Sequence, residues 1–206
     1  VEHNPKDLLT TVITTCKKAL NDGKISAKEI LALGITNQRE TTLLWDKNSG
    51  EPIYNAIVWQ DRRTSKFCDK LRSDGVEELI TNVTGLLLDP YFSATKLKWL
   101  LDNVEGARAK AEAGELLFGT VDTYLIWHLT NRVMHATDAT NASRTMLYDI
   151  NDCKWSSEIC DLLNIPMSIL PEVRNCSDDF GVCDEKILGH KIPIKGVAGD
   201  QHAATI

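Results

Sequence analysis

Several features that would assign this sequence to a specialised class of protein are absent. No run of 18 or more apolar residues occurs, so the sequence holds no candidate membrane span. The net charge of −6 argues against a broad nucleic-acid surface, which needs clustered Lys and Arg. No signal peptide is visible, and the sequence opens with Val1 inside an expected domain, so we expect residues upstream. With 43% hydrophobic residues, 206 residues suffice for one well-buried core.

Short motifs of metal, disulfide and dinucleotide chemistry are absent too. The six cysteines form no Cys-x-x-Cys pair and no zinc-finger spacing, which predicts unpaired thiols in a reducing cytosol. No Gly-x-Gly-x-x-Gly follows an expected strand, which argues against a Rossmann-type dehydrogenase. No repeat, linker or composition shift marks a domain boundary, so the sequence predicts a single domain.

The first third of the chain predicts a helix followed by short strands. Asn4 and Pro5 have the N-cap and first-turn preferences of a helix that extends to Leu20. Residues 31–36 form an apolar run without helical period, which predicts a short buried strand. Residues 41–45 and 54–59 predict two further strands. Polar segments follow the apolar runs at 37–40 and 60–63, and α/β folds bind ligands where strands end.

The remainder alternates expected helices and strands. Helices are predicted over 64–74 and 77–83, from Ser93 onward, over 121–129 and after Ser156. In the helix that begins at Ser93, Lys96 is expected to face outward. In the helix over 121–129, Asp122 is a possible cap. Residues 138–145 are small and polar and predict a hydrogen-bonded loop. Residues 192–198 predict a strand that ends at Gly199, with Asp200 at the start of a new helix.

Each polar residue near these strand ends has an ordinary structural interpretation. Asp200 at a helix start can be an N-cap. Arg39 and Glu40 can be a solvated pair worth about 0–1 kcal/mol. Trp59 can be a core residue at the end of an apolar run. These interpretations stay open from the residues alone.

Four segments together resemble one known family. They are Asn37-Gln38-Arg39-Glu40-Thr41-Thr42, residues 55–64, the gapless spacing of Tyr91, Ser93, Lys96, Trp99 and Asn103, and Gly199-Asp200-Gln201-His202-Ala203-Ala204. The chain thus resembles the glycerol kinases of the FGGY carbohydrate-kinase family along nearly its whole length.

The resemblance implies a fold and a domain organisation. We expect an α/β domain, actin-like and ribonuclease H-like, with a mixed central sheet flanked by helices. Residues 1–206 would be the substrate-binding N-terminal domain, incomplete at its N-terminus. The opening phosphate-binding strands and the C-terminal nucleotide domain are not matched, so the fragment alone is expected to be weak or inactive as an enzyme.

The resemblance also implies a reaction: ATP-dependent phosphorylation of glycerol to sn-glycerol 3-phosphate, with ATP and Mg²⁺ as cofactors, in the cytoplasm. Asp200 would be the general base, since a carboxylate within reach can take the proton of an attacking alcohol, and a ligand of the metal. Substrate-binding residues would be Arg39, Glu40, Trp59, Tyr91, Asp200 and Gln201. The expected partner is glycerol, with a homo-oligomer possible in the complete enzyme and no nucleic acid or membrane span.

Two alternatives remain at this stage. The chain can belong to an FGGY kinase for another polyol or sugar, although the bulky Trp59 and Tyr91 favour a three-carbon substrate. It can also be a truncated, non-catalytic domain that binds a polyol weakly. Glycerol titration calorimetry with and without an ATP analogue distinguishes these possibilities.

Overall fold

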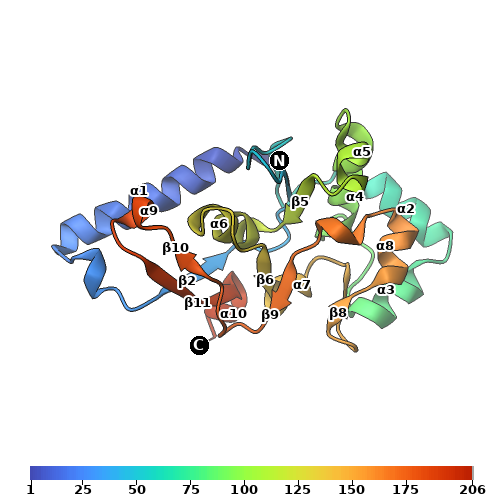
Figure 1. Cartoon of the computed structure of the whole chain (residues 1–206). Coiled ribbons are helices and arrows are strands. Elements are labelled where there is room, and N and C mark those ends of the chain that lie inside the picture. The colour runs from blue at the N-terminus through green and yellow to red at the C-terminus, as the bar shows by residue number, and fades with distance from the viewer. Residues whose placement is uncertain (206) are drawn as a thin grey trace.

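Figure 1 shows the computed structural model of the chain, which describes residues 1–205. The helices are α1 (Pro5–Gly23), α2 (Ser65–Ser73), α3 (Glu77–Thr84), α4 (Ser93–Asn103), α5 (Ala107–Glu112), α6 (Val121–Leu129), α7 (Ala139–Ala142), α8 (Ser157–Leu163), α9 (Glu185–Leu188) and α10 (Asp200–Ala203), with 3₁₀ turns η1 (Ala27–Glu29) and η2 (Met167–Ile169). The strands are β1 (Glu2–His3), β2 (Leu33–Asn37), β3 (Leu43–Asp46), β4 (Ala56–Ile57), β5 (Leu116–Gly119), β6 (Ala136–Asp138), β7 (Tyr148–Asp149), β8 (Lys154–Trp155), β9 (Glu172–Arg174), β10 (Val182–Cys183) and β11 (Ile192–Gly199). Among the described residues, no helix is long and apolar enough to cross a membrane.

The sheet that positions the site has the order β10-β11-β2 and is mixed, as expected. Strand β11 is parallel to β2 and antiparallel to β10. The register pairs Asn37 with Gly199, so the two strands end side by side. Residues that follow them, more than 160 positions apart in the sequence, therefore emerge at the same edge of the sheet.

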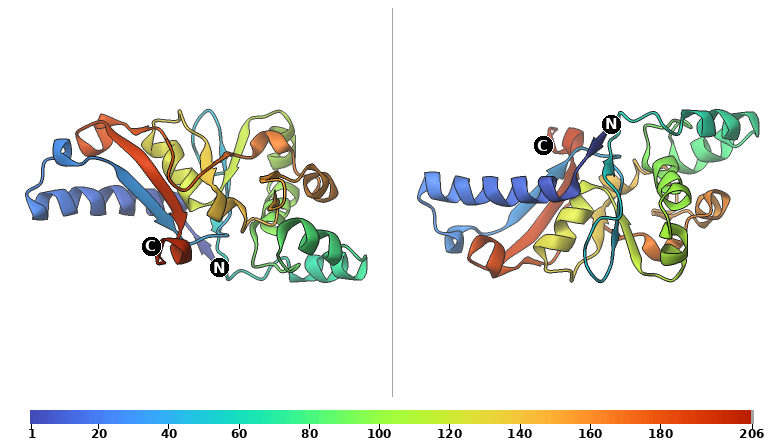
Figure 2. Two further views of the ribbon diagram at one scale, coloured as in Figure 1. Left: turned by 90° about the horizontal axis from the view of Figure 1, so that it is seen from below. Right: turned by 90° about the horizontal axis from the view of Figure 1, so that it is seen from above.

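Helix α1 covers one face of this sheet, and its predicted start is confirmed. The Asn4 side chain accepts a hydrogen bond from Lys6 N at 3.0 Å, and Pro5 is the first helical residue. Leu33 and Ile35 of β2 pack in the same apolar cluster as the inner side of α1. Figure 2 shows α1 crossing β2 and β11 obliquely in the view from above. The prediction of a buried strand is wrong, because the alternate residues Gly34 and Thr36 of β2 are exposed.

Strands β3 and β5 form a two-stranded antiparallel ladder between two apolar cores. Side chains alternate across a strand, so Leu44 faces one core while Leu43 and Trp45 face the other. The first core contains residues of α2, α3, α4, α5 and α8, which lie together on the right of Figure 1. The second is built from α6 and the β10-β11-β2 sheet. One chain thus carries two cores that share a ladder.

Three local predictions differ from the structure. Lys96, expected on the outside of α4, is fully buried, because the first turn of α4 packs under neighbouring loops and Ala94 N donates to Thr145 O at 2.8 Å. Asp122 does not cap α6; its carboxylate accepts from side chains in a buried polar cluster. Part of the expected loop at 138–145 is the short helix α7, which the Asp138 side chain caps.

Candidate substrate site

Arg39 is the residue around which the candidate site is built. It follows β2, and its side chain is 5% exposed. Its Nε lies 3.4 Å from Asp200 Oδ1, and its Nη2 donates to Gln201 Oε1 at 2.7 Å. Nη1 lies 3.4 Å from Nδ1 of His202, which accepts because a guanidinium only donates. The structure thus brings together Arg39, Asp200 and Gln201, which the family resemblance assigns to one site, and adds His202, for which no role was expected.

The approach of Arg39 to the end of β11 depends on Gly199. A Cβ at residue 199 would lie 2.2 Å from Arg39 Cδ, well inside van der Waals contact. Gly199 has φ −60°, so its backbone conformation is ordinary and the requirement for glycine is steric. The Gly-Asp sequence therefore lets the Arg39 side chain cross the strand end and reach Asp200.

Glu40 is held in place from both its backbone and its side chain. Its φ of 59° is left-handed, and its backbone oxygen accepts from Thr42 Oγ1 and Ser93 Oγ, both at 3.1 Å. Its carboxylate, 2% exposed, accepts from Arg144 Nε at 2.8 Å. This geometry turns the side chains of the adjacent residues 39 and 40 in different directions. Arg39 meets the end of β11, and Glu40 meets Arg144.

Arg144 connects Glu40 to the aromatic residues of the site. Its Cζ lies 5.9 Å from the centre of the Tyr91 ring and 5.0 Å from that of Phe92. Tyr91 and Trp59 are half-buried, with ring centres 5.4 Å apart and planes tilted by 53°. A continuous series of contacts therefore joins Glu40, Arg144, Tyr91 and Trp59. Sequence reasoning missed Arg144, although the density of hydrogen-bonding residues at 138–145 was the available signal.

Lys96 lies directly beneath this aromatic group. Its Nζ donates to the backbone oxygens of Tyr91 and Pro90, the latter at 3.4 Å. Burial lowers the pKa of its ammonium to about 7, against the opposing effect of the Glu40 charge. Because the helical pattern of α4 cannot reveal loops that fold over its first turn, no local pattern indicated that this lysine is buried. Lys96 fixes the backbone that carries Tyr91.

A fully buried polar cluster underlies the ends of β2 and β6. Asn37 Nδ2 donates to Asp122 Oδ1 at 3.2 Å and to Asn141 Oδ1 at 3.0 Å. Asn141 Nδ2 donates in turn to Asp138 Oδ1 at 2.7 Å. Burial raises the pKa of Asp122 to about 6, although the hydroxyls of Thr120 and Thr137 donate to its carboxylate and act in the opposite direction. The cluster ties the strand that leads to Arg39 to α6, β6 and α7.

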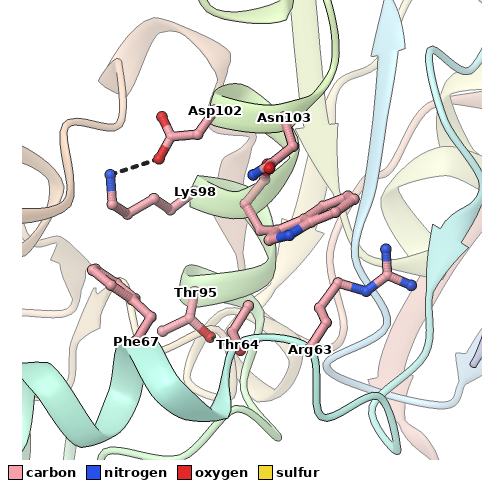
Figure 3. A pocket seen from close by; sticks show the side chains of 8 residues that line it. Arg63, Thr64, Phe67, Thr95, Lys98, Asp102 and Asn103 are labelled. Atoms are coloured by element: carbon pink, nitrogen blue, oxygen red, sulfur yellow. Dashed lines mark hydrogen bonds and ion pairs between the residues drawn. The ribbon is translucent and has the colours of Figure 1, made fainter.

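The second polar segment, at 60–63, does not join the site. Arg63 Nε pairs with Asp61 at 2.8 Å and Arg63 Nη2 with Glu2 at 2.6 Å. The Arg63 guanidinium also lies 4.5 Å from the centre of the Trp99 ring. Figure 3 shows the pocket of about 180 Å³ that Arg63 and Trp99 border between α2 and α4, where Lys98 bonds to Asp102. The polar segment at 60–63 therefore forms a group of its own with Glu2, separate from the contacts of Arg39 and Glu40.

Comparison with known structures identifies the fold. The chain superposes on the crystal structure of Plasmodium falciparum glycerol kinase with ADP with a TM-score of 0.92, at 36% identity over 98% of this chain and 41% of that one. A gluconate kinase from Lactobacillus acidophilus shares the fold with a TM-score of 0.86 at 22% identity. The expected actin-like α/β fold is confirmed.

Comparison of sequences identifies the family. The model of the N-terminal domain of the FGGY family of carbohydrate kinases matches residues 1–206. The chain is also 60% identical over its full length to a glycerol kinase of Roseobacter denitrificans and 59% identical to one of Alteromonas mediterranea. It spans 42% of the length of each of these relatives. The chain belongs to the FGGY family of carbohydrate kinases and matches its N-terminal domain.

Proposed function

We propose that the polypeptide carrying this domain transfers the γ-phosphoryl group of ATP to a primary hydroxyl of glycerol, forming sn-glycerol 3-phosphate. The observation that carries the proposal is the grouping of Asp200 and Gln201 around the buried Arg39 guanidinium. Support for the substrate comes from relatives of 56–60% identity that are named glycerol kinases.

Asp200 is the proposed general base. Its side chain is 52% exposed, so a ligand hydroxyl can approach its carboxylate from solvent. As the hydroxyl oxygen attacks the γ-phosphorus, its proton passes to Asp200, while the bond from phosphorus to the bridging oxygen breaks and ADP leaves. Asp200 then returns the proton to solvent. Arg39 Nε, 3.4 Å from Oδ1, orients the carboxylate and stabilises charge that develops nearby.

The other hydroxyls and the carbon skeleton are bound by the remaining residues. Glu40 accepts hydrogen bonds from ligand hydroxyls, and the Arg144 contact at 2.8 Å fixes the direction of its carboxylate. The half-buried faces of Trp59 and Tyr91 pack against the carbon chain. Gln201 donates through its amide nitrogen, since its Oε1 already accepts from Arg39. In this arrangement, ligand contacts come from four separate segments of the chain.

The proposed cofactors are ATP and Mg²⁺, with the nucleotide bound mainly by parts of the kinase outside these residues. Residues 1–205 hold no group of three or more His, Cys, Asp or Glu side chains that would bind a metal by themselves. Mg²⁺ in phosphoryl-transfer enzymes needs only one or two carboxylates beside the substrate phosphates and water. Asp200, half exposed, fits that limited role, and the ion would neutralise charge on the β- and γ-phosphates.

Steady-state assays with the complete polypeptide that carries this domain test the proposal. ADP release is measured with glycerol, gluconate and xylulose as acceptors, in the presence of ATP and Mg²⁺. Glycerol is expected to have the highest kcat/KM by at least tenfold. A preference for gluconate or xylulose would retain a kinase but overturn the glycerol assignment. Calorimetric binding of glycerol without turnover on any acceptor would indicate a non-catalytic binding protein.

A further inference from the structure

The end of β11 is held on its outer side by a side chain instead of a strand. Val197 N donates to the backbone oxygen of Cys176 at 2.9 Å. Two residues further along, where the N–H points the same way, Gly199 N donates to the Thr140 hydroxyl at 2.8 Å. Thr140 Oγ1 therefore occupies the place of a neighbouring strand's carbonyl oxygen, immediately before Asp200.

The Thr140 hydroxyl has a fixed orientation. It donates to Asp138 Oδ2 at 2.6 Å, and Thr140 N donates to the same oxygen at 2.8 Å. Asp138 is fully buried, and its other oxygen accepts from the Asn141 side chain at 2.7 Å. Since a backbone N–H only donates, the Thr140 oxygen accepts from Gly199 and directs its proton to Asp138. Hydrogen-bond donation thus runs in one direction, from the Gly199 amide to the Thr140 hydroxyl and from that hydroxyl to the Asp138 carboxylate.

The Thr140 hydrogen bonds and the Arg39 side chain hold residues 199 and 200 through separate contacts. Arg39 crosses Gly199 and pairs with the Asp200 carboxylate, while Thr140 binds the Gly199 amide. The two restraints also share an origin, because Asn141 bonds to both Asp138 and Asn37, two residues before Arg39. The buried cluster therefore sets the position of both strand ends.

We propose that Thr140, supported by Asp138, is a positioning residue for Asp200 through its hydrogen bond to the Gly199 amide. It does not touch the substrate; it fixes the backbone from which the base projects. The proposal rests on the phosphoryl transfer proposed above. Misplacement of a reacting group by about 1 Å can cost about 10²-fold in rate, so loss of one hydroxyl outside the site can be measured kinetically.

The test compares Thr140→Val, Thr140→Ser and a matched control in the complete polypeptide. Thr140→Val is expected to lower kcat about 10–100-fold while the glycerol dissociation constant changes less than about threefold. Thr140→Ser keeps the hydroxyl and is expected to retain kcat within about threefold. Thr130→Val is the control, because the Thr130 hydroxyl also accepts a backbone N–H, from Met134 at 3.1 Å, and donates to Ile126 O at 2.7 Å. Thr140→Ala repeats the deletion if valine prevents folding.

A double mutant separates a positioning role from a structural one. If Thr140 acts through Asp200, Thr140→Val in an Asp200→Asn background lowers the residual rate no further. Amide exchange at Gly199, measured by NMR, is expected to accelerate in Thr140→Val and remain slow in Thr140→Ser. Unchanged kcat in Thr140→Val, an equal loss in Thr130→Val, or multiplicative losses in the double mutant would each overturn the proposal. A wild-type protein that fails to phosphorylate glycerol would instead overturn the proposed function, and the exchange measurement would still report on the hydrogen bond.

Discussion

The side chain of Arg39 lies across Gly199, so that a Cβ at residue 199 would be 2.2 Å from Arg39 Cδ and 2.7 Å from its Cγ. The parallel pairing of β2 with β11 creates this crossing, because Asn37 and Gly199 are register partners and Arg39 turns back over the neighbouring strand end. The contact between Arg39 and Asp200 therefore requires two opposite charges and also a glycine at residue 199, because a side chain there would clash with Arg39.

Gly199→Ala is expected to displace Arg39 and separate it from Asp200. The added methyl group cannot fit without movement of the Arg39 stem, so we expect kcat/KM for glycerol to fall about 10²-fold or more. Steady-state kinetics of the complete polypeptide measure this. Gly34→Ala in the adjacent strand is the matched control, since a Cβ there meets no atom within 4 Å. An alanine at 199 that left kcat/KM unchanged would show that the Arg39 contact is dispensable.

Asp200→Asn removes the proposed base while keeping the size and most hydrogen-bonding capacity of the side chain. We expect kcat to fall about 10²–10⁴-fold, the usual contribution of a general base, with the glycerol dissociation constant nearly unchanged. Turnover assays and glycerol calorimetry on the same preparation give both quantities. Wild-type turnover in this variant would remove Asp200 from the mechanism.

Trp59→Ala is expected to weaken glycerol binding before it affects folding. Trp59 is half-buried and packs against Tyr91, so its loss removes an apolar surface worth about 1–3 kcal/mol to a small ligand, or about 10–200-fold in KM. Trp45→Ala is the contrasting variant, because Trp45 is fully buried in the second core and its loss should destabilise the fold by about 3–5 kcal/mol. Calorimetry and urea unfolding distinguish the two. If Trp59→Ala lost as much folding stability as Trp45→Ala, Trp59 would be a core residue and not a ligand contact.

Acid is expected to destabilise the domain partly through His135. Burial lowers the pKa of His135 to about 4 in the folded protein, although Nε2 donates to Phe118 O at 2.8 Å. The unfolded state takes up the proton near the ordinary value of 6.5, so folding stability is complete above about pH 6.5 and falls as the pH drops toward 4. One pKa unit is worth about 1.4 kcal/mol, which gives a loss of about 2 kcal/mol by pH 5.

Urea unfolding at pH 7 and pH 5 measures this contribution. His135→Gln can retain the hydrogen bond to Phe118 but cannot titrate, so its stability should fall by about 2 kcal/mol less than that of the wild type between the two pH values. His3→Gln is the control for exchanging an imidazole for an amide at an exposed position. Equal pH dependence in wild type and His135→Gln would exclude this source of acid sensitivity.

Local structure could largely be predicted from the sequence, because helix capping, hydrophobic periodicity and the turn residues at strand ends depend on a few neighbouring residues. The α1 start at Asn4 and Pro5 and the β11-to-α10 junction both follow these rules. The burial of Lys96 was not predictable, since the first turn of α4 is covered by segments distant in the sequence: Ser93 bonds to the backbone of Glu40, 53 positions away, and Ala94 to that of Thr145.

The sequence by itself determined the chemical groups of this domain: a Gly-Asp at a strand end, an Arg-Glu pair after another strand, and a recognisable family. The tertiary structure alone decided which of them meet. The parallel register of β2 and β11 places Arg39 against Asp200, whereas Arg63 is drawn into a separate group with Asp61 and Glu2. Both are arginines that follow apolar runs, and only long-range strand pairing, which no local pattern encodes, distinguishes them.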